Sequence, residues 1–438
     1  MTSSLALTLA FCLSQTQAPA PRTVEMQVFT EEADENGGDG YSPSPEAAHE
    51  TLRFTGYLDV GYAVARGNGS SFAPGDTRLP ADYTVDAFAP AINSRGEVAS
   101  IDSGGRFMNG FLPRSAGLGS TPSFLINTLS ADLRFTPSEV PLMFFARAQF
   151  MPRFSSSGDA TRVLLQQAFA KWNPISTQEF SVALGRFDSV FGIEYLENEA
   201  NLRLNITPSL IARYTTGHSL GLKGFYRVQL PSLWSAVSLN VAATNNGTRV
   251  EELAGPSLSF SGVPVGSARL GYELNLQAVQ MKLGVSGLYG PRSDQKSWDV
   301  RQMALGLDFR LNAFGVAVAA ELLRLVDEPG KAAGKFTGLG SYELATGFAV
   351  WGGYVLLGYA LPFEYGHFNR LTFYGRYERR HAQFKGFTPI AVDRLTVGGR
   401  VDLFDRVALK AEWLVNREVA GAPYVDNNVF TSSAVFTW

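Results

Sequence analysis

Residues 428–438 read Asn-Val-Phe-Thr-Ser-Ser-Ala-Val-Phe-Thr-Trp, and the rest of the fold can be worked out from this stretch. Phe430, Ser432, Ala434, Phe436 and Trp438 occupy alternate positions. Successive side chains of a β-strand point to opposite faces, so this spacing predicts a strand whose two faces meet different surroundings. An ordinary edge strand that ends in tryptophan is the alternative interpretation, and the preceding residues decide between the two.

The period of two recurs from Thr51 onward. Leu305, Leu307 and Phe309, for example, alternate with Asp308 and Arg310. Segments of this kind predict strands that are apolar on one face and wetted on the other. The predicted strands are 52–64, 123–136, 142–152, 161–172, 178–187, 218–230, 233–244, 266–277, 279–290, 300–311, 313–325, 341–362, 368–380, 391–403, 407–416 and 428–438.

Short and long connections alternate between these strands. The short connections include 231–232, 312–313 and 404–406, and the long ones include 65–122, 188–217, 245–265, 326–340 and 417–427. Outer-membrane barrels have short periplasmic turns and long extracellular loops, whereas a soluble β-sandwich has no reason to sort its loops in this way. We therefore predict an all-β fold over residues 51–438, a transmembrane antiparallel β-barrel of about 16 strands, with 18 strands as the alternative count.

The last predicted strand also resembles the assembly signal of outer-membrane barrels, because an aromatic residue ends an alternating segment. The resemblance assigns this signal to Phe436 and Trp438 and makes the barrel assembly machinery a partner. One segment argues for a different structure: residues 344–363 carry no charge over a length that a membrane helix needs. Five glycines and prolines interrupt that segment, namely Gly347, Gly352, Gly353, Gly358 and Pro362, and they favour a long tilted strand.

The N-terminal residues predict export. Residues 1–20 hold a short apolar run followed by small residues and resemble a signal peptide, although no Lys or Arg precedes the run. Residues 21–50 are acidic and rich in Gly, Ser and Pro, which predicts a disordered periplasmic lead-in. The expected location is therefore the outer membrane of a Gram-negative cell, with its lipid as a partner.

The composition excludes several classes of function. A net charge of −3 and a pI of about 5.9 give no basic field for nucleic acid. The one cysteine, Cys12, lies in the predicted leader, and the four histidines are far apart in sequence. We therefore expect no cofactor and no metal site.

A closed barrel of about sixteen strands encloses more space than side chains usually fill, so its polar face predicts a water-filled pore. That face carries thirteen basic against nine acidic residues in the predicted strands. Rings of Arg and Lys favour anions, so we predict a mild anion preference, with charge pairing across strands as the alternative. The predicted pore-lining residues are Arg134, Arg147, Lys223, Arg227, Arg269, Arg310, Arg376, Arg400 and Lys410.

The third long connection, 188–217, is the predicted constriction loop. Its acidic residues, such as Glu194 and Glu197, are expected to face the arginines of the wall and to set up a transverse field. A solvated loop outside the barrel is the alternative. The predicted constriction residues are Arg186, Asp188, Glu194, Glu197, Arg203 and Arg213.

Residues 185–225 also carry a family resemblance. A glycine-rich strand end at 185 precedes Phe191-Gly192-Ile193-Glu194, several asparagines, Ser209 and then Thr216-Gly217 before the next strand. This order resembles the beta-barrel porin-2 (OmpL-like) family. The resemblance implies an outer-membrane porin-like channel and indicates no particular solute.

The predicted function is passive diffusion of small hydrophilic solutes, and a homotrimer is expected by analogy with sixteen-stranded porins. Two alternatives stay open. Loop 65–122 could act as a surface adhesin, or His218 or His381 could serve a hydrolase beside Asp188 or Asp393. Neither Gly-x-Ser-x-Gly nor His-Glu-x-x-His occurs in the chain, which argues against the hydrolase.

Overall fold

The structure is a computed structural model of the 438-residue chain. It describes residues 51–65, 98–101, 107–112, 123–150, 163–175, 179–197, 199–230, 234–245, 263–276, 278–291, 300–328, 348–361, 367–384, 390–404, 406–420 and 428–438. The predicted signal peptide and acidic lead-in lie outside these residues, as does most of loop 65–122.

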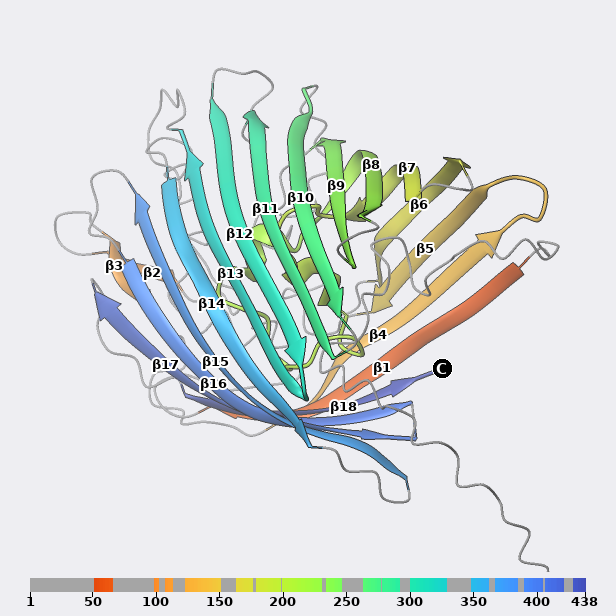
Figure 1. The fold of residues 1–438 in the computed structure, drawn as a ribbon. Helices are drawn as coiled ribbons and strands as arrows, with labels where there is room; N and C mark the ends of the chain where they lie inside the picture. Colours follow the sequence, from red (N-terminus) through yellow and green to blue (C-terminus); the bar gives the residue numbers. More distant parts are fainter. Residues whose placement is uncertain are drawn as a thin grey trace, which may run out of the picture.

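Sixteen antiparallel strands close into a barrel, which confirms the predicted fold and strand count (Figure 1). Two further strands, β2 (Val98–Ile101) and β3 (Phe107–Leu112), form a separate two-stranded sheet. The barrel strands are β1 (Thr51–Ala65), β4 (Ser123–Thr136), β5 (Leu142–Phe150), β6 (Val163–Ile175), β7 (Glu179–Asp188), β8 (His218–Leu230), β9 (Ser235–Thr244), β10 (Val265–Leu276), β11 (Val279–Pro291), β12 (Arg301–Ala313), β13 (Val316–Asp327), β14 (Phe348–Leu361), β15 (Phe368–Phe384), β16 (Ile390–Leu403), β17 (Val407–Ala420) and β18 (Val429–Thr437).

The barrel closes where β18 pairs with β1. The register runs from Tyr57 opposite Thr437 to Ala65 opposite Val429. Beyond it, the Gly56 N–H donates to the Trp438 carbonyl at 3.3 Å, and the Trp438 N–H donates to the Gly56 carbonyl at 3.1 Å. The two residues of the predicted assembly signal thus lie at the seam, and the side chains of both Phe436 and Trp438 are exposed.

The connections sort by length between the two ends of the barrel, as predicted. One end, the short-turn end, has the connections 137–141, 176–178, 231–234, 277–278, 314–315, 362–367 and 404–406. The other, the long-loop end, has 66–122, 151–162, 189–217, 245–264, 292–300, 328–347, 385–389 and 421–428. The predicted ends were wrong at several strands, and β15 and β17, for example, continue to Phe384 and Ala420. Residues 341–347 and 362 of the predicted strand 341–362 lie outside the described residues.

The predicted turn at 312–313 was also wrong. The chain turns at Phe314 and Gly315, whose φ angles are 51° and 79°. Two consecutive positive φ angles are typical of the type I′ turn, which matches the twist of the flanking strands. The uncharged segment 344–363 forms β14, and no helix among the described residues is long and apolar enough to cross a membrane.

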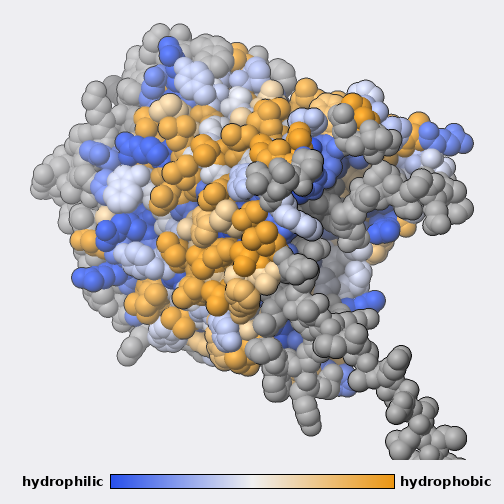
Figure 2. Space-filling model, viewed as in Figure 1, coloured by the Kyte–Doolittle hydropathy of each residue, from blue (hydrophilic) through white to orange (hydrophobic). Residues whose placement is uncertain are grey.

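The two faces of the wall differ as the alternation predicted. Leu305 and Leu307 on β12 each leave 54% of their surface exposed on the outside, whereas Asp308 and Arg310, at the alternate positions that follow, are buried inside. Figure 2 shows hydrophobic side chains gathered over the outer wall that faces the viewer. An exposed apolar surface of this extent, on a closed sheet without open edges, suits a hydrocarbon environment.

Aromatic residues occupy three strained turn positions at the short-turn end. Trp234, Phe314 and Phe404 have φ angles of 48°, 51° and 53°, in the left-handed region that bulky residues rarely adopt. All three side chains are more than half exposed. Aromatic rings are favoured at the boundary between hydrocarbon and water, which is where the turns of a membrane barrel lie.

The seam leaves no room for a side chain at residue 56. A Cβ on Gly56 would lie 2.3 Å from the Ser130 carbonyl oxygen and 2.5 Å from Cζ2 of Trp438. We therefore expect Gly56→Ala to destabilise the barrel by about 1–3 kcal/mol, the usual range for overpacking. The measurement is the denaturant midpoint of refolded protein, read from heat-modifiable migration on gels.

Gly287→Ala is the matched control, because a Cβ there would meet nothing closer than 4.0 Å. Its midpoint should stay near that of the wild type. Equal midpoints for the two variants would contradict the role of the seam.

Candidate functional site

Residues 188–217, the inner segment, leave the wall at the end of β7 and return at the start of β8. Asp188 and His218 are register partners, and the Ser189 N–H donates to the Gly217 carbonyl at 3.0 Å. The segment contains a 3₁₀ turn, η3 (Glu194–Glu197), and one turn of helix, α1 (Ala212–Thr215). It lies inside the ring of strands, where Figure 1 draws it in yellow-green.

The first part of the inner segment binds to β11 and β13. The Gly192 N–H donates to Oγ of Ser286 at 3.0 Å, and the N–H groups of Ile193 and Glu194 both donate to Oε2 of Glu321 at 3.2 Å. Gly192 has a φ of +76°, and a Cβ there would lie 2.1 Å from Oε1 of Glu321. Only glycine fits this contact, which accounts for the Phe-Gly-x-Glu sequence.

The middle part reaches other walls of the barrel. The Glu197 carboxylate pairs with Arg310 of β12 at 2.7 Å. Glu199 accepts hydrogen bonds from the Tyr57 hydroxyl of β1 and the Gln149 amide of β5, both at 2.6 Å, and pairs with Arg147 of β5 at 2.7 Å. The segment therefore crosses the interior from one side to the other.

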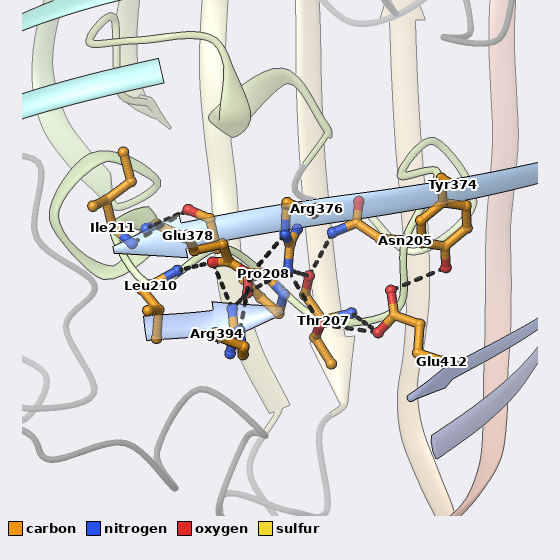
Figure 3. Close-up of polar contacts among 12 residues, drawn as sticks. Asn205, Thr207, Pro208, Leu210, Ile211, Tyr374, Arg376, Glu378, Arg394 and Glu412 are labelled. Atoms are coloured by element: carbon orange, nitrogen blue, oxygen red, sulfur yellow. Dashed lines mark hydrogen bonds and ion pairs between the residues drawn. The ribbon is translucent and has the colours of Figure 1, made fainter. Parts of the chain in front are cut away.

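The later part is held by β15, β16 and β17 (Figure 3). Glu412 accepts from the N–H groups of Ile206 and Thr207 at 2.8 and 3.1 Å, and from the Thr207 hydroxyl at 2.9 Å. Its fourth donor is the Tyr374 hydroxyl at 3.0 Å. On β15, Glu378 accepts from the Leu210 N–H at 2.6 Å. Wall carboxylates thus take the place of backbone partners for a chain that is not part of the sheet.

Wall arginines complete this attachment by donating to segment carbonyls. Arg376 donates to the Thr207 and Pro208 carbonyls at 2.9 and 3.1 Å, and Arg394 donates to the Pro208 carbonyl. Both guanidinium groups also pair with Glu378 at 2.8 Å. One buried carboxylate therefore ties two strands of the wall and the segment together.

An apolar core lies between the inner segment and the wall. The Phe191 ring lies over Gly306 of β12, and Ile211 lies over Gly352 of β14, where added Cβ atoms would be 2.8 and 2.9 Å from these side chains. The cluster comprises Phe191, Leu204, Leu210, Ile211, Tyr214, Val265, Leu288, Ala304, Ala317, Ala319, Leu323, Leu325, Val350, Tyr354, Leu356, Ala360, Tyr374 and Val392. The expectation of a uniformly polar inner face was therefore wrong for β13 and β14, because the segment covers them.

Glu194 bonds within the segment. Its carboxylate accepts from the Ser209 N–H at 2.6 Å and from the Ser209 hydroxyl. Burial raises the pKa of this carboxyl above its ordinary value, while the Arg376 charge and the Ser209 bonds oppose the rise. Burial thus favours the protonated carboxyl in the folded protein, and this contribution to stability is lost as rising pH ionises the group.

The predicted wall residues lie as follows. Most of them engage carboxylates or segment carbonyls, and Lys223 lies 5.8 Å from the Tyr195 ring centre. Arg134 lies half-buried on the inner face of β4, two residues from Asp132. The ion pairs and carbonyl contacts are Arg147 with Asp132 and Glu199, Arg227 with Glu179 and Glu273, Arg269 with Asp308, Arg310 with Glu197, Arg376 with Glu378, Arg400 with Asp402 and the Arg203 carbonyl, and Lys410 with the Ala200 and Arg203 carbonyls.

Five of the six predicted constriction residues belong to the inner segment, and Arg186 lies before it on β7. Glu194 and Glu197 lie inside the barrel in the contacts given above. Arg203 donates to the Asn205 carbonyl within the segment at 3.1 Å, whereas Arg186 donates to the Gln166 carbonyl of β6 at 2.9 Å. Arg213 belongs to α1, and its side chain lies outside the described part of the structure.

One of the histidine–aspartate pairs predicted for the hydrolase alternative, His218 with Asp188, is present in the structure. Nε2 of His218 lies 2.8 Å from Oδ1 of Asp188. In the part of the chain that the structure describes, no serine, threonine or cysteine side chain hydrogen-bonds with this imidazole. His381 instead stacks on Trp351, with ring centres 5.3 Å apart.

The sequence prediction missed Tyr57, Gln149, Glu199 and Arg380 as inner residues of the site. Tyr57 and Gln149 carry no charge, so the pattern of charged residues on the predicted strands does not identify them. Glu199 follows Glu197 at a spacing of two in the predicted constriction loop, and this repeat of acidic residues is a pattern that identifies it as a candidate.

Solved structures with a similar fold are outer-membrane proteins. The outer-membrane channel DcaP of Acinetobacter baumannii is 10% identical, with a TM-score of 0.51, and the match covers 89% of this chain and 98% of that one. The fold is that of an outer-membrane barrel. An outer-membrane protein of Vibrio cholerae, OmpT, matches at 8% identity and a TM-score of 0.49, covering 89% and 98% of the two chains.

The anion-selective porin from Comamonas acidovorans matches at 10% identity and a TM-score of 0.46, covering 89% of this chain and all of that one (100%). No family model matches the sequence, and no curated protein matches it either. The comparisons therefore establish the barrel fold and leave the beta-barrel porin-2 resemblance as a prediction.

Glu412→Gln tests how firmly the inner segment is attached. A glutamine presents one oxygen and one amide to four donors, so buried N–H groups of the segment lose their acceptor. We expect local opening to become easier by about 2 kcal/mol, which corresponds to about thirtyfold faster hydrogen exchange at the amides of Ile206 and Thr207.

Glu273→Gln is the matched control, since Glu273 pairs with Arg227 on the wall. Exchange at the same two amides should not change in that variant. Unchanged protection of these amides in Glu412→Gln would rule out the attachment.

Proposed function

We propose that the protein is an outer-membrane channel through which small hydrophilic solutes diffuse passively, with the inner segment as its constriction. Support comes from the two faces of the wall: the outer face suits hydrocarbon, and the inner face carries ion pairs and hydrogen-bonding groups. A barrel of sixteen strands is wide enough to enclose an aqueous path.

The observation that carries the proposal is the course of the inner segment. Its contacts reach Arg147 on β5 and Arg394 on β16, which lie on different sides of the ring of strands. A solute that passes this level must therefore move along side chains of the segment as well as of the wall. Such a segment narrows a wide barrel and gives it size selection.

Charge selection follows from the same arrangement. The wall alone has an excess of basic residues, and the segment adds the carboxylates of Glu194, Glu197 and Glu199 to the interior. These acids offset part of that excess, while Arg203 of the segment adds a positive charge to the interior. We therefore propose a weak anion preference instead of a strong one.

The remaining assignments extend this proposal. Residues 1–20 act as a signal peptide, the barrel assembly machinery recognises the strand that ends in Phe436 and Trp438, and the barrels assemble as homotrimers. The arrangement of residues 185–225 supports a relationship to the beta-barrel porin-2 (OmpL-like) family. An adhesive role for loop 65–122 is the alternative, and most of that loop lies outside the described residues.

Removal of the inner segment tests the constriction. Asp188 and His218 are register partners, so Gly-Gly-Ser-Gly in place of residues 190–216 closes the gap without a shift of the barrel strands. Single-channel conductance in planar bilayers should rise, roughly twofold or more, because a wider path carries more current.

A deletion of residues 248–262, in the connection between β9 and β10, is the matched control and should leave conductance near the wild-type value. Refolded, heat-modifiable wild-type protein without any conductance steps would refute the channel. Equal conductance for the wild type and the 190–216 deletion would refute the constriction.

Reversal potentials in a salt gradient test the charge selection. We expect a small shift toward the anion potential, because acids of the segment offset part of the basic excess. Clear cation selectivity would contradict this part of the proposal and would leave the channel itself standing.

A further inference from the structure

Two arginines of the inner wall have hydrogen-bond donors that nothing in the described structure accepts. Arg380 of β15 is 1% exposed, and its Nε and Nη2 atoms have no partner. Arg394 of β16 is fully buried, and its Nη1 atom has no partner although Nε and Nη2 are bonded. Both side chains therefore offer free N–H groups in a place that excludes water.

The register places these arginines side by side. Arg380 is opposite Val392, and Arg394 is opposite Glu378, so the two are diagonal neighbours on the same face of the β15–β16 pair. Side chains in this relation lie within reach of a shared small ligand, because the guanidinium stems are long.

The surroundings supply no counter-charge to Arg380. Val392 of β16 is fully buried, and Ile211 of the segment lies over Gly352, which is the register partner of Arg380 on β14. The nearby carboxylate of Glu378 already accepts from Arg376, Arg394 and the Leu210 N–H. Among the described residues, no carboxylate forms an ion pair with Arg380.

A buried guanidinium without an acceptor is costly, because the desolvated charge gains nothing in return. The unmet groups are all donors. Nε and Nη2 of Arg380 form a planar fork, which matches the bidentate geometry of phosphate and carboxylate oxygens, and Nη1 of Arg394 adds a further donor. We propose that Arg380 and Arg394 form a binding site for a small oxyanion inside the barrel.

This site deepens the proposed function, on which its role in transport rests. Arg380 lies two residues beyond Glu378 on β15, toward the long-loop end, whereas Arg376 and Glu378 hold the inner segment. A solute that enters from the long loops would therefore meet the site near the constriction. The channel then favours solutes that carry a phosphate or carboxylate group.

The test is calorimetric titration of inorganic phosphate into refolded full-length protein in detergent, at constant ionic strength set with sodium chloride. We expect saturable binding of one phosphate per barrel, weakened at least tenfold in Arg380→Gln. Acetate in place of phosphate shows whether a planar carboxylate is also accepted, and competition by either anion should exceed that of chloride.

Arg379→Gln is the matched control, since it removes one positive charge from the adjacent residue, which is partly exposed and pairs with Asp393. Phosphate affinity should stay within about twofold of the wild type in this variant. Arg380→Lys retains the charge without the planar fork and should bind with intermediate affinity.

The wild-type titration keeps the proposal falsifiable even where Arg380→Gln does not fold. Absence of saturable phosphate binding to the wild type means that water alone satisfies these donors, and it overturns the site. Equal affinities for wild type and folded Arg380→Gln overturn it as well. Phosphate binding without conductance would refute the channel and retain the site, whereas conductance without phosphate binding would do the reverse.

Discussion

The backbone hydrogen bonds of the closed sheet are the constraint on which the rest of the structure depends. In hydrocarbon an unpaired N–H or C=O costs several kcal/mol, so a sheet can cross a membrane only without free edges. The ring of sixteen strands meets this condition, and the bonds between Gly56 and Trp438 extend the pairing at its seam. Once the ring is closed, the apolar side chains are free to lie outside, and the charged ones must be accommodated within.

The interior is organised by the opposite requirement. A chain segment that leaves the sheet needs acceptors for its own N–H groups, and the wall supplies them through Glu321, Glu378 and Glu412. These carboxylates are buried, and wall arginines pair with Glu378 while the Tyr374 hydroxyl donates to Glu412. The same contacts that pair the charges of the wall therefore also hold the inner segment in place.

Sequence patterns predicted the sixteen strands because the period of two and the alternation of short and long connections are local features of the sequence. They failed for the inner face of β13 and β14, where Leu323, Leu325 and Val350 point inward. Those residues are apolar because Phe191 and Ile211 pack on them, and only the tertiary structure shows that contact. The lack of charge on the inner face of β14 has the same explanation, since Val350, Leu356 and Ala360 belong to this core. Arg380 ends the predicted strand 368–380, and the finding that no described residue accepts from its Nε and Nη2 atoms depends on the tertiary structure and not on a local pattern.

The three strained aromatic turns distinguish one end of the barrel from the other. Trp234, Phe314 and Phe404 all belong to the end with brief connections, and the opposite end bears long stretches of chain. When one end of a barrel passes through a bilayer, movement stops once aromatic rings, which prefer the head-group zone, reach that zone. The exposed rings of these three turns thus distinguish the two ends of the barrel, and they lie where a boundary between hydrocarbon and water would stabilise them.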